Sequence, residues 1–371
     1  MSQPAPSTET RTEPGSRWRE LAPERRAELR GLIEAALRAP NGDNTQPWAF
    51  SPHPAGFDVH LVPERSASVF DPDDLASRMA LGALLETARL AGGPVGLRVS
   101  WQLDPEPGMR HCWARVAIAR GEPATEDLAS AIDRRESNRL PFEETPLTAA
   151  EQSGLAGEAR TPVGVRLITD RRHVESVAAM VGRAEIVRVE NREAHENLHR
   201  WLRWTPAEAA ATRDGLDVRT LGLTPHERWS LRLMKPWWFM SALRPLAAPL
   251  MTHHAREGVM RSGALIALSV RELDRASAVS VGITMQRVWL RATLLGLAMS
   301  PLAALPLFYQ QVVRGHPAFA HRADELTRLQ GELEGLAGLG PGERVAMLLR
   351  TGHATPTPVR SLRRNVEDCL L

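Results

Sequence analysis

The most informative part of this sequence is one stretch, Pro40-Asn41-Gly42-Asp43-Asn44-Thr45-Gln46-Pro47-Trp48. It follows residues 21–38, whose apolar side chains recur at spacings of three and four, as on one face of a helix. Pro40 and Gly42 end that helix, and the glycine allows a ligand to approach the main chain closely. Asn41, Asn44 and Gln46 supply neutral hydrogen-bonding groups. Two interpretations stay open from these residues: a polar ligand-binding loop, or a turn whose amides satisfy backbone groups.

The segments on both sides of this loop predict an α+β fold made of two halves. Long apolar helices are expected at residues 75–91 and 279–296, and each half also offers strand patterns after its polar loop. The predicted organisation is a disordered tail at 1–17, a first half at 18–125 and a second half at 126–371. The second half includes a tryptophan-rich insert at about 195–262. Part of that insert could form core packing or a lid over the site, and both interpretations stay open.

Composition narrows the class of protein further. The 371 residues carry a formal net charge of +2, with acidic residues interleaved among the basic ones, which argues against a nucleic-acid partner. No run of about 18 apolar residues and no signal-peptide pattern is seen, so neither a membrane partner nor secretion is expected. The two cysteines are far apart and no metal-ligand spacing occurs. These features predict a cytoplasmic protein without a metal site.

Two arginine-rich elements suggest anion binding. The first holds Arg135, Ser137 and Arg139, and the second ends the chain with Arg363 and Arg364. Guanidinium groups suit a phosphate because they donate two parallel hydrogen bonds to it. The alternatives are a solvated helix end for the first element and a basic surface tail for the second.

The loop and the first arginine element together resemble the nitroreductase-like flavoproteins. The loop matches the signature Pro-Ser-x-x-Asn-x-Gln-Pro-Trp at Pro40, Asn44, Gln46, Pro47 and Trp48. Asn41 and Gly42 stand where that family often has small hydroxyl residues. The arginine element resembles the family's Arg-x-Ser-x-Arg. The resemblance implies a bound flavin mononucleotide (FMN), with Arg135 and Ser137 near its phosphate and ribityl chain and Arg139 at the N1/O2 edge of the ring.

Two further segments are similar to the same family. Residues 282–302 resemble its central helix, in which Gln286 stands at a family position, followed by a proline loop at Pro301. The resemblance implies that a backbone N–H of Leu302 or Ala303 faces flavin N5. It also implies that a C-terminal arginine, Arg363 or its neighbour Arg364, holds the phosphate.

The order of the motifs is the reverse of that in ordinary members, where the arginine element precedes the loop. This order resembles the longer single-chain members of the Acg type. The resemblance implies a pseudo-dimer in which the first half lends the loop, the second half lends the arginines, and one flavin lies between them. A monomer or a weak homodimer is expected.

The function expected from the resemblance is that of an FMN-dependent oxidoreductase. It would pass hydride or electrons from NAD(P)H through FMN to a small organic acceptor, with Arg139 as the electrostatic candidate for catalysis. Two alternatives stay open: a non-catalytic protein that sequesters FMN, and a biosynthetic dehydrogenase that acts on a natural product or a modified peptide.

Overall fold

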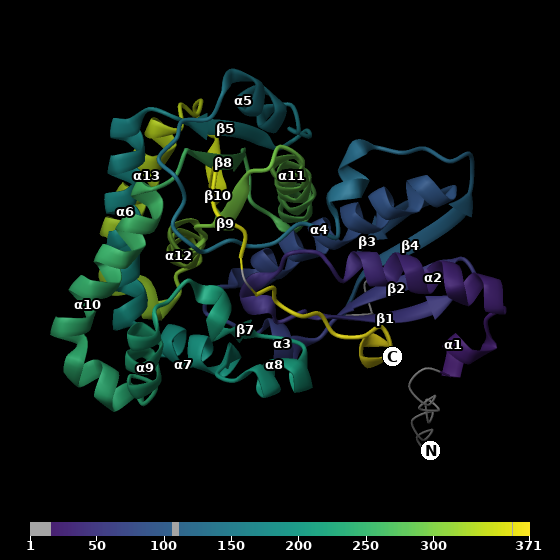
Figure 1. Ribbon diagram of the computed structural model, residues 1–371, viewed down its shortest axis with the longest axis horizontal. Coiled ribbons are helices and arrows are strands. Elements are labelled where there is room, and N and C mark those ends of the chain that lie inside the picture. Colours follow the sequence, from purple (N-terminus) through teal and green to yellow (C-terminus); the bar gives the residue numbers. More distant parts are fainter. Residues whose placement is uncertain (1–15, 106–110, 358) are drawn as a thin grey trace, which may run out of the picture.

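The computed structural model describes residues 16–105, 111–357 and 359–371 and contains two four-stranded antiparallel sheets (Figure 1). The first has the order β1-β2-β4-β3, with strands β1 (Trp48–His53), β2 (Gly56–Leu61), β3 (Leu97–Leu103) and β4 (Cys112–Arg120). The second has the order β5-β8-β10-β9, with strands β5 (Gly164–Ile168), β8 (Ala264–Val270), β9 (Ala298–Pro301) and β10 (Arg344–Gly352). Each sheet belongs to one half of the sequence. The predicted α+β organisation in two halves is confirmed.

Two long helices, α4 (Leu75–Gly92) and α11 (Arg275–Leu294), pack against each other between the sheets (Figure 1). Their backbones touch at a pair of glycines. A Cβ atom on Gly82 would lie 2.0 Å from the carbonyl oxygen of Val279, and one on Gly282 would lie 1.8 Å from that of Met79. Only glycine permits this approach from both sides. Each half therefore contributes one helix to a common centre.

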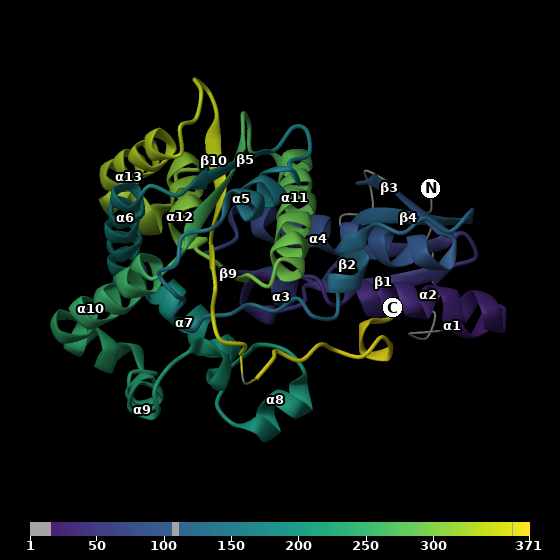
Figure 2. The same ribbon diagram turned by 45° about the horizontal axis from the view of Figure 1, so that its top comes forward.

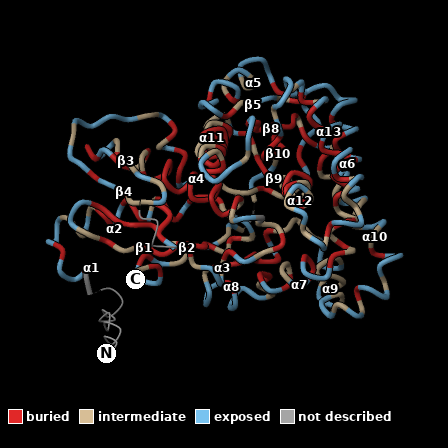
Figure 3. The backbone as a smooth tube through the Cα atoms, turned by 180° about the vertical axis from the view of Figure 1, so that it is seen from behind, coloured by how far each residue is buried: buried red, intermediate tan, exposed pale blue. Residues whose placement is uncertain are grey.

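The remaining helices outside the insert cover the sheets. The first half has α1 (Ser16–Glu20), α2 (Pro23–Ala36) and α3 (Pro63–Ser66), and the second half has α5 (Ala149–Ala156), α6 (Arg171–Glu190), α12 (Ala304–Val313) and α13 (Ala323–Leu336). The buried face of α2 follows the predicted periodicity, with Leu29, Leu32 and Ile33 in the core. Side chains of α6, α12 and α13 form a second core with β8 and β10. Figure 3 shows the sheets, α4 and α11 as the most buried parts of the chain.

The tryptophan-rich insert is helical. Its elements are α7 (Arg192–Trp201), β6 (Leu202–Arg203), α8 (Pro206–Thr212), β7 (Leu216–Asp217), α9 (Pro225–Leu233) and α10 (Trp237–Met260). Helices α8 and α9 each begin with a threonine–glutamate capping box. The threonine side chain accepts from the backbone N–H of the glutamate, and the glutamate carboxylate accepts from the backbone N–H of the threonine. Helix α10 packs against α6, and α7 reaches the loop that follows α2.

The last residues of the chain cross from the second half to the first. After β10 the chain runs as an arm, residues 353–371, which ends beside β1 (Figure 2). There Leu370 forms a bridge with Phe50, and the Leu371 amide donates to the Phe50 carbonyl at 2.9 Å. This crossing brings the C-terminal arginines to the polar loop of the first half.

The structure differs from the sequence-based expectations in a few elements. The alternating apolar residues 57–62, which predict a strand, form the second arm of a hairpin with β1. The first arm, β1, was not predicted because its residues alternate poorly. Helices α12 and α13 were also not predicted. Of the expected tail, residues 1–15 lie outside the described residues, and 16–17 begin α1. Among the helices that the structure describes, none is long and apolar enough to cross a membrane.

Candidate functional site

The polar loop lies where the first half, the insert and the C-terminal arm meet. The Asn44 amide donates to the carbonyls of Gly215 at 2.9 Å and Leu362 at 3.1 Å. The Gln46 amide donates to the carbonyl of Arg213 at 2.9 Å. Asn44 and Gln46 are both buried. Their side chains therefore bind backbone groups of distant segments, and they fix the loop in place for whatever it binds.

The backbone of this loop is held in an uncommon conformation. Asp43, Asn44 and Gln46 have φ values of 47°, 53° and 50°, in the left-handed region that costs a non-glycine residue about 1 kcal/mol or more. The Asn41 side chain supports the bend, because its oxygen accepts a hydrogen bond from the backbone N–H of Gln46 at 2.8 Å. Next to it, Gly42 is exposed, and no atom lies within 4 Å of its Cβ direction. The loop thus presents an open main-chain edge beside a strained turn, a combination found at ligand sites.

Two arginine side chains converge behind the loop, one from each arginine element. Arg135 is buried, donates to the Arg38 carbonyl at 2.8 Å, and stacks on the Trp289 ring at 4.9 Å. Arg363 donates to the Asn44 oxygen at 2.7 Å. Burial lowers the pKa of both groups, and the charge of Arg363 lowers the pKa of Arg135 further. The two guanidinium groups are therefore close enough to repel each other.

These two arginines still have N–H groups to offer. Nε and one terminal nitrogen of Arg135, and Nε of Arg363, are buried and have no hydrogen-bond partner among the described residues. Each guanidinium makes some hydrogen bonds, but a buried N–H group that lacks a partner is costly, and repulsion between two cations adds to that cost. An anion placed between them would remove both costs.

A second group of charges lies around Arg139. Asp43 attracts Arg139, and the Asn197 amide of α7 donates to the Asp43 carboxylate at 3.2 Å. Burial raises the pKa of Asp43, while Arg139 and then Arg188 oppose that rise. Asp43 and Arg139 are both half-buried, and burial shifts the pKa of each group toward its neutral form. Sequence reasoning did not select Asp43, because its partners come from the second half and the insert.

The segment between Arg135 and Arg139 is extended, and its central residues fix its path. Asn138 is buried. Its backbone N–H donates to the Met299 carbonyl at 3.0 Å, and its side-chain amide donates to the Thr355 carbonyl at 2.8 Å. Ser137 lies beside it, half-buried.

No family model matches the chain. The "Putative NAD(P)H nitroreductase Rv3131" of Mycobacterium tuberculosis (strain ATCC 25618 / H37Rv) is 25% identical over 349 residues, which is 91% of each chain. The "Putative NAD(P)H nitroreductase acg" of the same strain is 25% identical over 279 residues, which is 74% of this chain and 79% of that one. The chain is similar to long nitroreductase-like proteins. The similarity to the Acg type that was expected from the reversed motifs is thereby confirmed.

Other comparisons are more distant or cover a longer protein. An uncharacterized protein of M. tuberculosis (strain CDC 1551 / Oshkosh) is 27% identical over 338 residues, which is 90% of this chain and 47% of that protein. The chain spans about half the length of that relative. A solved structure of a mutant of the FMN- and NADPH-dependent nitroreductase NfnB, from a bacterium given as sphigopyxis sp. strain HMH, is 19% identical. It covers 66% of this chain and 97% of its own, with a TM-score of 0.35.

The structure separates the two arginines of the C-terminal element in this nitroreductase-like chain. The Arg363 guanidinium donates to the side-chain oxygen of Asn44 in the polar loop. The Arg364 backbone amide donates to the Gln46 side-chain oxygen at 2.8 Å, while its guanidinium donates to the Asp368 carbonyl. Arg363 is therefore the better candidate for the phosphate, and Arg364 anchors the arm.

The remaining nitroreductase-like positions lie in the second half. Gln286 is fully buried between α11 and α4, where its amide donates to the Thr87 hydroxyl at 2.9 Å. The side-chain oxygen of Gln286 has no partner among the residues described. The Leu302 amide, which follows Pro301, donates to the Leu348 carbonyl at 2.8 Å. Since the Leu302 N–H is engaged, Ala303 is the remaining candidate of the two for a contact with a ligand.

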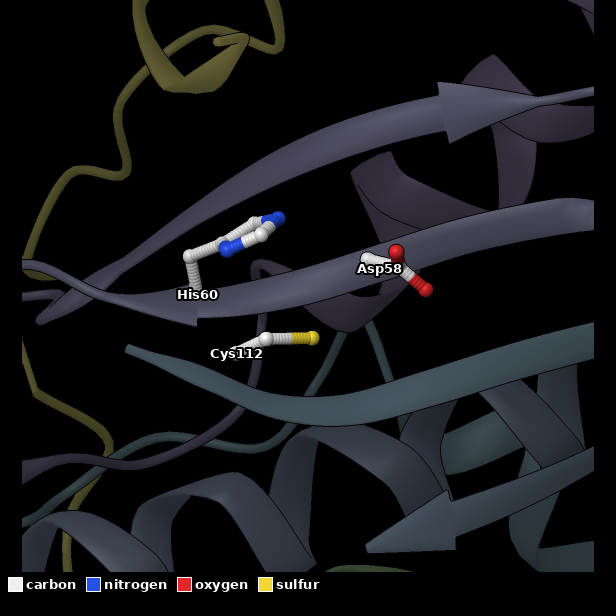
Figure 4. A group of neighbouring side chains, drawn as sticks. All are labelled: Asp58, His60 and Cys112. Carbon is white, nitrogen blue, oxygen red and sulfur yellow. The ribbon is translucent and has the colours of Figure 1, made fainter. Parts of the chain in front are cut away.

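One further cluster combines residue types that can bind metal. Asp58 and His60 of β2 and Cys112 of β4 have potential ligand atoms within 4.8 Å of one another (Figure 4). The Asp58 carboxylate, however, forms an ion pair with Arg115 at 3.0 Å. Its charge is therefore already balanced by a cation, and we assign no metal to this cluster.

Proposed function

We propose that this protein binds FMN at the junction of its halves and acts as an NAD(P)H-dependent oxidoreductase. The observation that carries the proposal is the pair Arg135 and Arg363, which donate to the neighbouring carbonyls of Arg38 and Ala39 and each keep a buried N–H group without a partner among the described residues. The proposal is supported by the names of the relatives, which are NAD(P)H nitroreductases of similar length.

The residues present fit FMN at the phosphate end. Arg135 and Arg363 would hold the phosphate, with Ser137 and the open edge at Gly42 close to the ribityl chain. Arg139 would stand beside the ring, where a fixed cation favours negative charge on a reduced flavin. Ala303 is the candidate for a backbone donor to the ring. Bound FMN would supply the hydride and electron transfer.

The protein itself would position the flavin, enclose it and tune its reactivity. The loop is fixed by hydrogen bonds to the insert and to the arm, so the ligand groups are organised before binding. Helix α7 contacts the polar loop, and its Asn197 side chain donates to Asp43. We infer that the insert limits access of water and admits a small organic acceptor. One chain supplies every residue of the site, which favours a monomeric pseudo-dimer that works in the cytoplasm.

A second candidate function is FMN sequestration without turnover. The observation that favours it is the number of bonds that close the insert on the loop: Asn197 to Asp43, Asn44 to the Gly215 carbonyl, and Gln46 to the Arg213 carbonyl. An insert held this firmly would slow exchange of acceptors.

One anaerobic titration distinguishes these functions. The purified protein is saturated with FMN, freed of excess flavin, and mixed with NADPH or NADH while the flavin absorbance is recorded. An oxidoreductase loses the oxidised flavin band, and a small nitroarene or quinone restores it. Persistent colour with both nicotinamides supports sequestration, and a protein that retains no FMN refutes the proposal.

A further inference from the structure

Helix α10 is apolar on two sides, although the protein covers only one of them. Between Trp237 and Met251 a single residue, Arg244, carries a charge. Met240 and Ala247 are buried on the side that packs against α6. The opposite side is apolar as well, yet it faces outward. A helix that is apolar all round is ordinarily buried all round, so a further surface is expected to cover it.

The outward side forms a continuous stripe. Its members recur at spacings of three and four, and all of them are exposed: Trp238, Ala242, Pro245, Leu246, Pro249 and Leu250. The exposed fractions are 72% for Trp238, 76% for Leu246 and 60% for Leu250. Isolated exposed leucines are common on soluble proteins, but a contiguous group marks an interaction surface.

The neighbouring helix α9 extends this stripe. Trp229 is 60% exposed and Leu233 is 45% exposed, and the two helices are joined by a contact between Glu227 and His254 at 3.7 Å. Figures 1 and 2 both place α9 and α10 together at one outer end of the molecule. We name these exposed side chains of both helices the α9–α10 surface. It holds five of the nine large apolar side chains that are exposed in the described residues.

The segment that carries the α9–α10 surface is net basic. Residues 225–260 contain five lysine or arginine residues and two acidic ones, a net charge of +3 that exceeds the +2 of the whole chain. Arg232, Lys235 and Arg256 are exposed, although Arg232 also lies over the Trp204 ring at 5.9 Å and the stem of Arg256 packs at Gly182 of α6. The excess positive charge of the segment gives it a means of attracting an anionic partner.

We propose that the α9–α10 surface docks on an anionic phospholipid bilayer and lies in its interface. Tryptophan, leucine and flanking cations are the combination that such interfaces select. A second copy of the chain fits less well, because a symmetric contact would set two basic patches against each other. The proposal departs from the sequence-based expectation of no membrane partner. It concerns a surface contact and is independent of the proposed flavin chemistry.

The test uses the full chain and vesicles of phosphatidylcholine with or without phosphatidylglycerol. Flotation is expected with the anionic vesicles, together with a blue shift of tryptophan fluorescence and a steep loss of binding as salt rises. The double variant Leu246→Ser/Leu250→Ser should lower partitioning by about tenfold or more, because both side chains are exposed in solution and would be buried in lipid. Val95→Ser, which alters a 67% exposed valine in the first half, should bind as the wild type does.

Charge gives an independent arm of the test. Arg232→Glu/Lys235→Glu should abolish the preference for anionic vesicles while the circular dichroism spectrum stays unchanged. Absence of flotation at low salt would overturn the proposal. So would a dimer in sedimentation velocity that Leu246→Ser/Leu250→Ser dissociates, since the surface would then serve a second copy of the chain.

Discussion

Replacing Arg135 with methionine should have opposite effects on the empty and the FMN-bound protein. In the empty protein this buried guanidinium donates to the Arg38 carbonyl and stacks on Trp289. Loss of these contacts costs about 1–3 kcal/mol together. The same change removes a buried cation that lacks two partners and faces Arg363, a burden of several kcal/mol. The stability of the empty protein should therefore stay within about 1 kcal/mol of wild type, or rise.

FMN binding should change in the other direction. Two N–H groups of Arg135 are free to reach a phosphate. A hydrogen bond to a charged group is worth about 1.5–3 kcal/mol, so the loss is about 3–6 kcal/mol. At about 1.4 kcal/mol for each factor of ten, FMN affinity should fall by about 10²- to 10⁴-fold. The double variant Arg135→Ala/Arg363→Ala should purify without colour.

Two measurements on each variant check this reasoning. Urea unfolding of the flavin-free protein gives its stability, and quenching of FMN fluorescence gives the affinity. Arg364→Met is the matched control, because the Arg364 guanidinium donates to the Asp368 carbonyl within the arm and is not assigned to the phosphate. The phosphate assignment would be refuted by an Arg135→Met protein that binds FMN within threefold of wild type. Strong destabilisation of the flavin-free protein would show that Arg135 is a structural residue.

Three further predictions concern packing, pH and chain stoichiometry. Gly82→Ala should lower thermal stability strongly, because the added Cβ would meet a backbone oxygen at 2.0 Å. Gly331 has open space around it, so Gly331→Ala should be neutral or stabilising by about 0.5–1 kcal/mol in the same melting experiment. Burial, helped by His195, Lys235 and Arg188, lowers the pKa of His199 to about 4. Because the unfolded chain binds this proton more readily than the folded protein, the stability that the neutral His199 contributes above pH 6.5 is lost as pH falls toward 4. In His199→Phe, the free energy of unfolding in urea should therefore differ less between pH 7 and pH 4.5, by up to about 3 kcal/mol. Mixing an Asn44→Ala chain with an Arg135→Met chain should not restore FMN binding if each chain holds its own site, and restoration in an equilibrium titration would indicate a site shared between chains.

The sequence predicted those parts of the site that local motifs encode. The polar loop and Arg135 lie in short patterns whose spacing survives folding, and both reach one junction. The helices at residues 75–91 and 279–296 were predicted from their apolar content. Their meeting at Gly82 and Gly282 was not, because contact between helices depends on which faces the two halves present to each other.

What the sequence did not reveal depends on contacts between residues far apart in the chain. The amide of Gln46 bonds to a carbonyl 167 residues away, and that of Asn197 to Asp43, 154 residues away. The type of residue does not distinguish an amide that binds a ligand from one that binds a distant backbone group. Asp43 was missed for the same reason. Its carboxylate gains significance only where Arg139 and the insert surround it.

The C-terminal arm explains why the two halves depend on each other at the site. It leaves the second sheet, passes the polar loop, and ends on β1 of the first sheet. Arg363 therefore reaches Asn44 only when both halves are folded and the arm is docked. The same holds for the backbone N–H of Arg364, which donates to the side-chain oxygen of Gln46. An anion bound between Arg135 and Arg363 would relieve their repulsion and would hold the arm against the loop. By mass action, such a ligand stabilises the docked arm as well as occupying the site, so cofactor binding and the association of the two halves should be coupled.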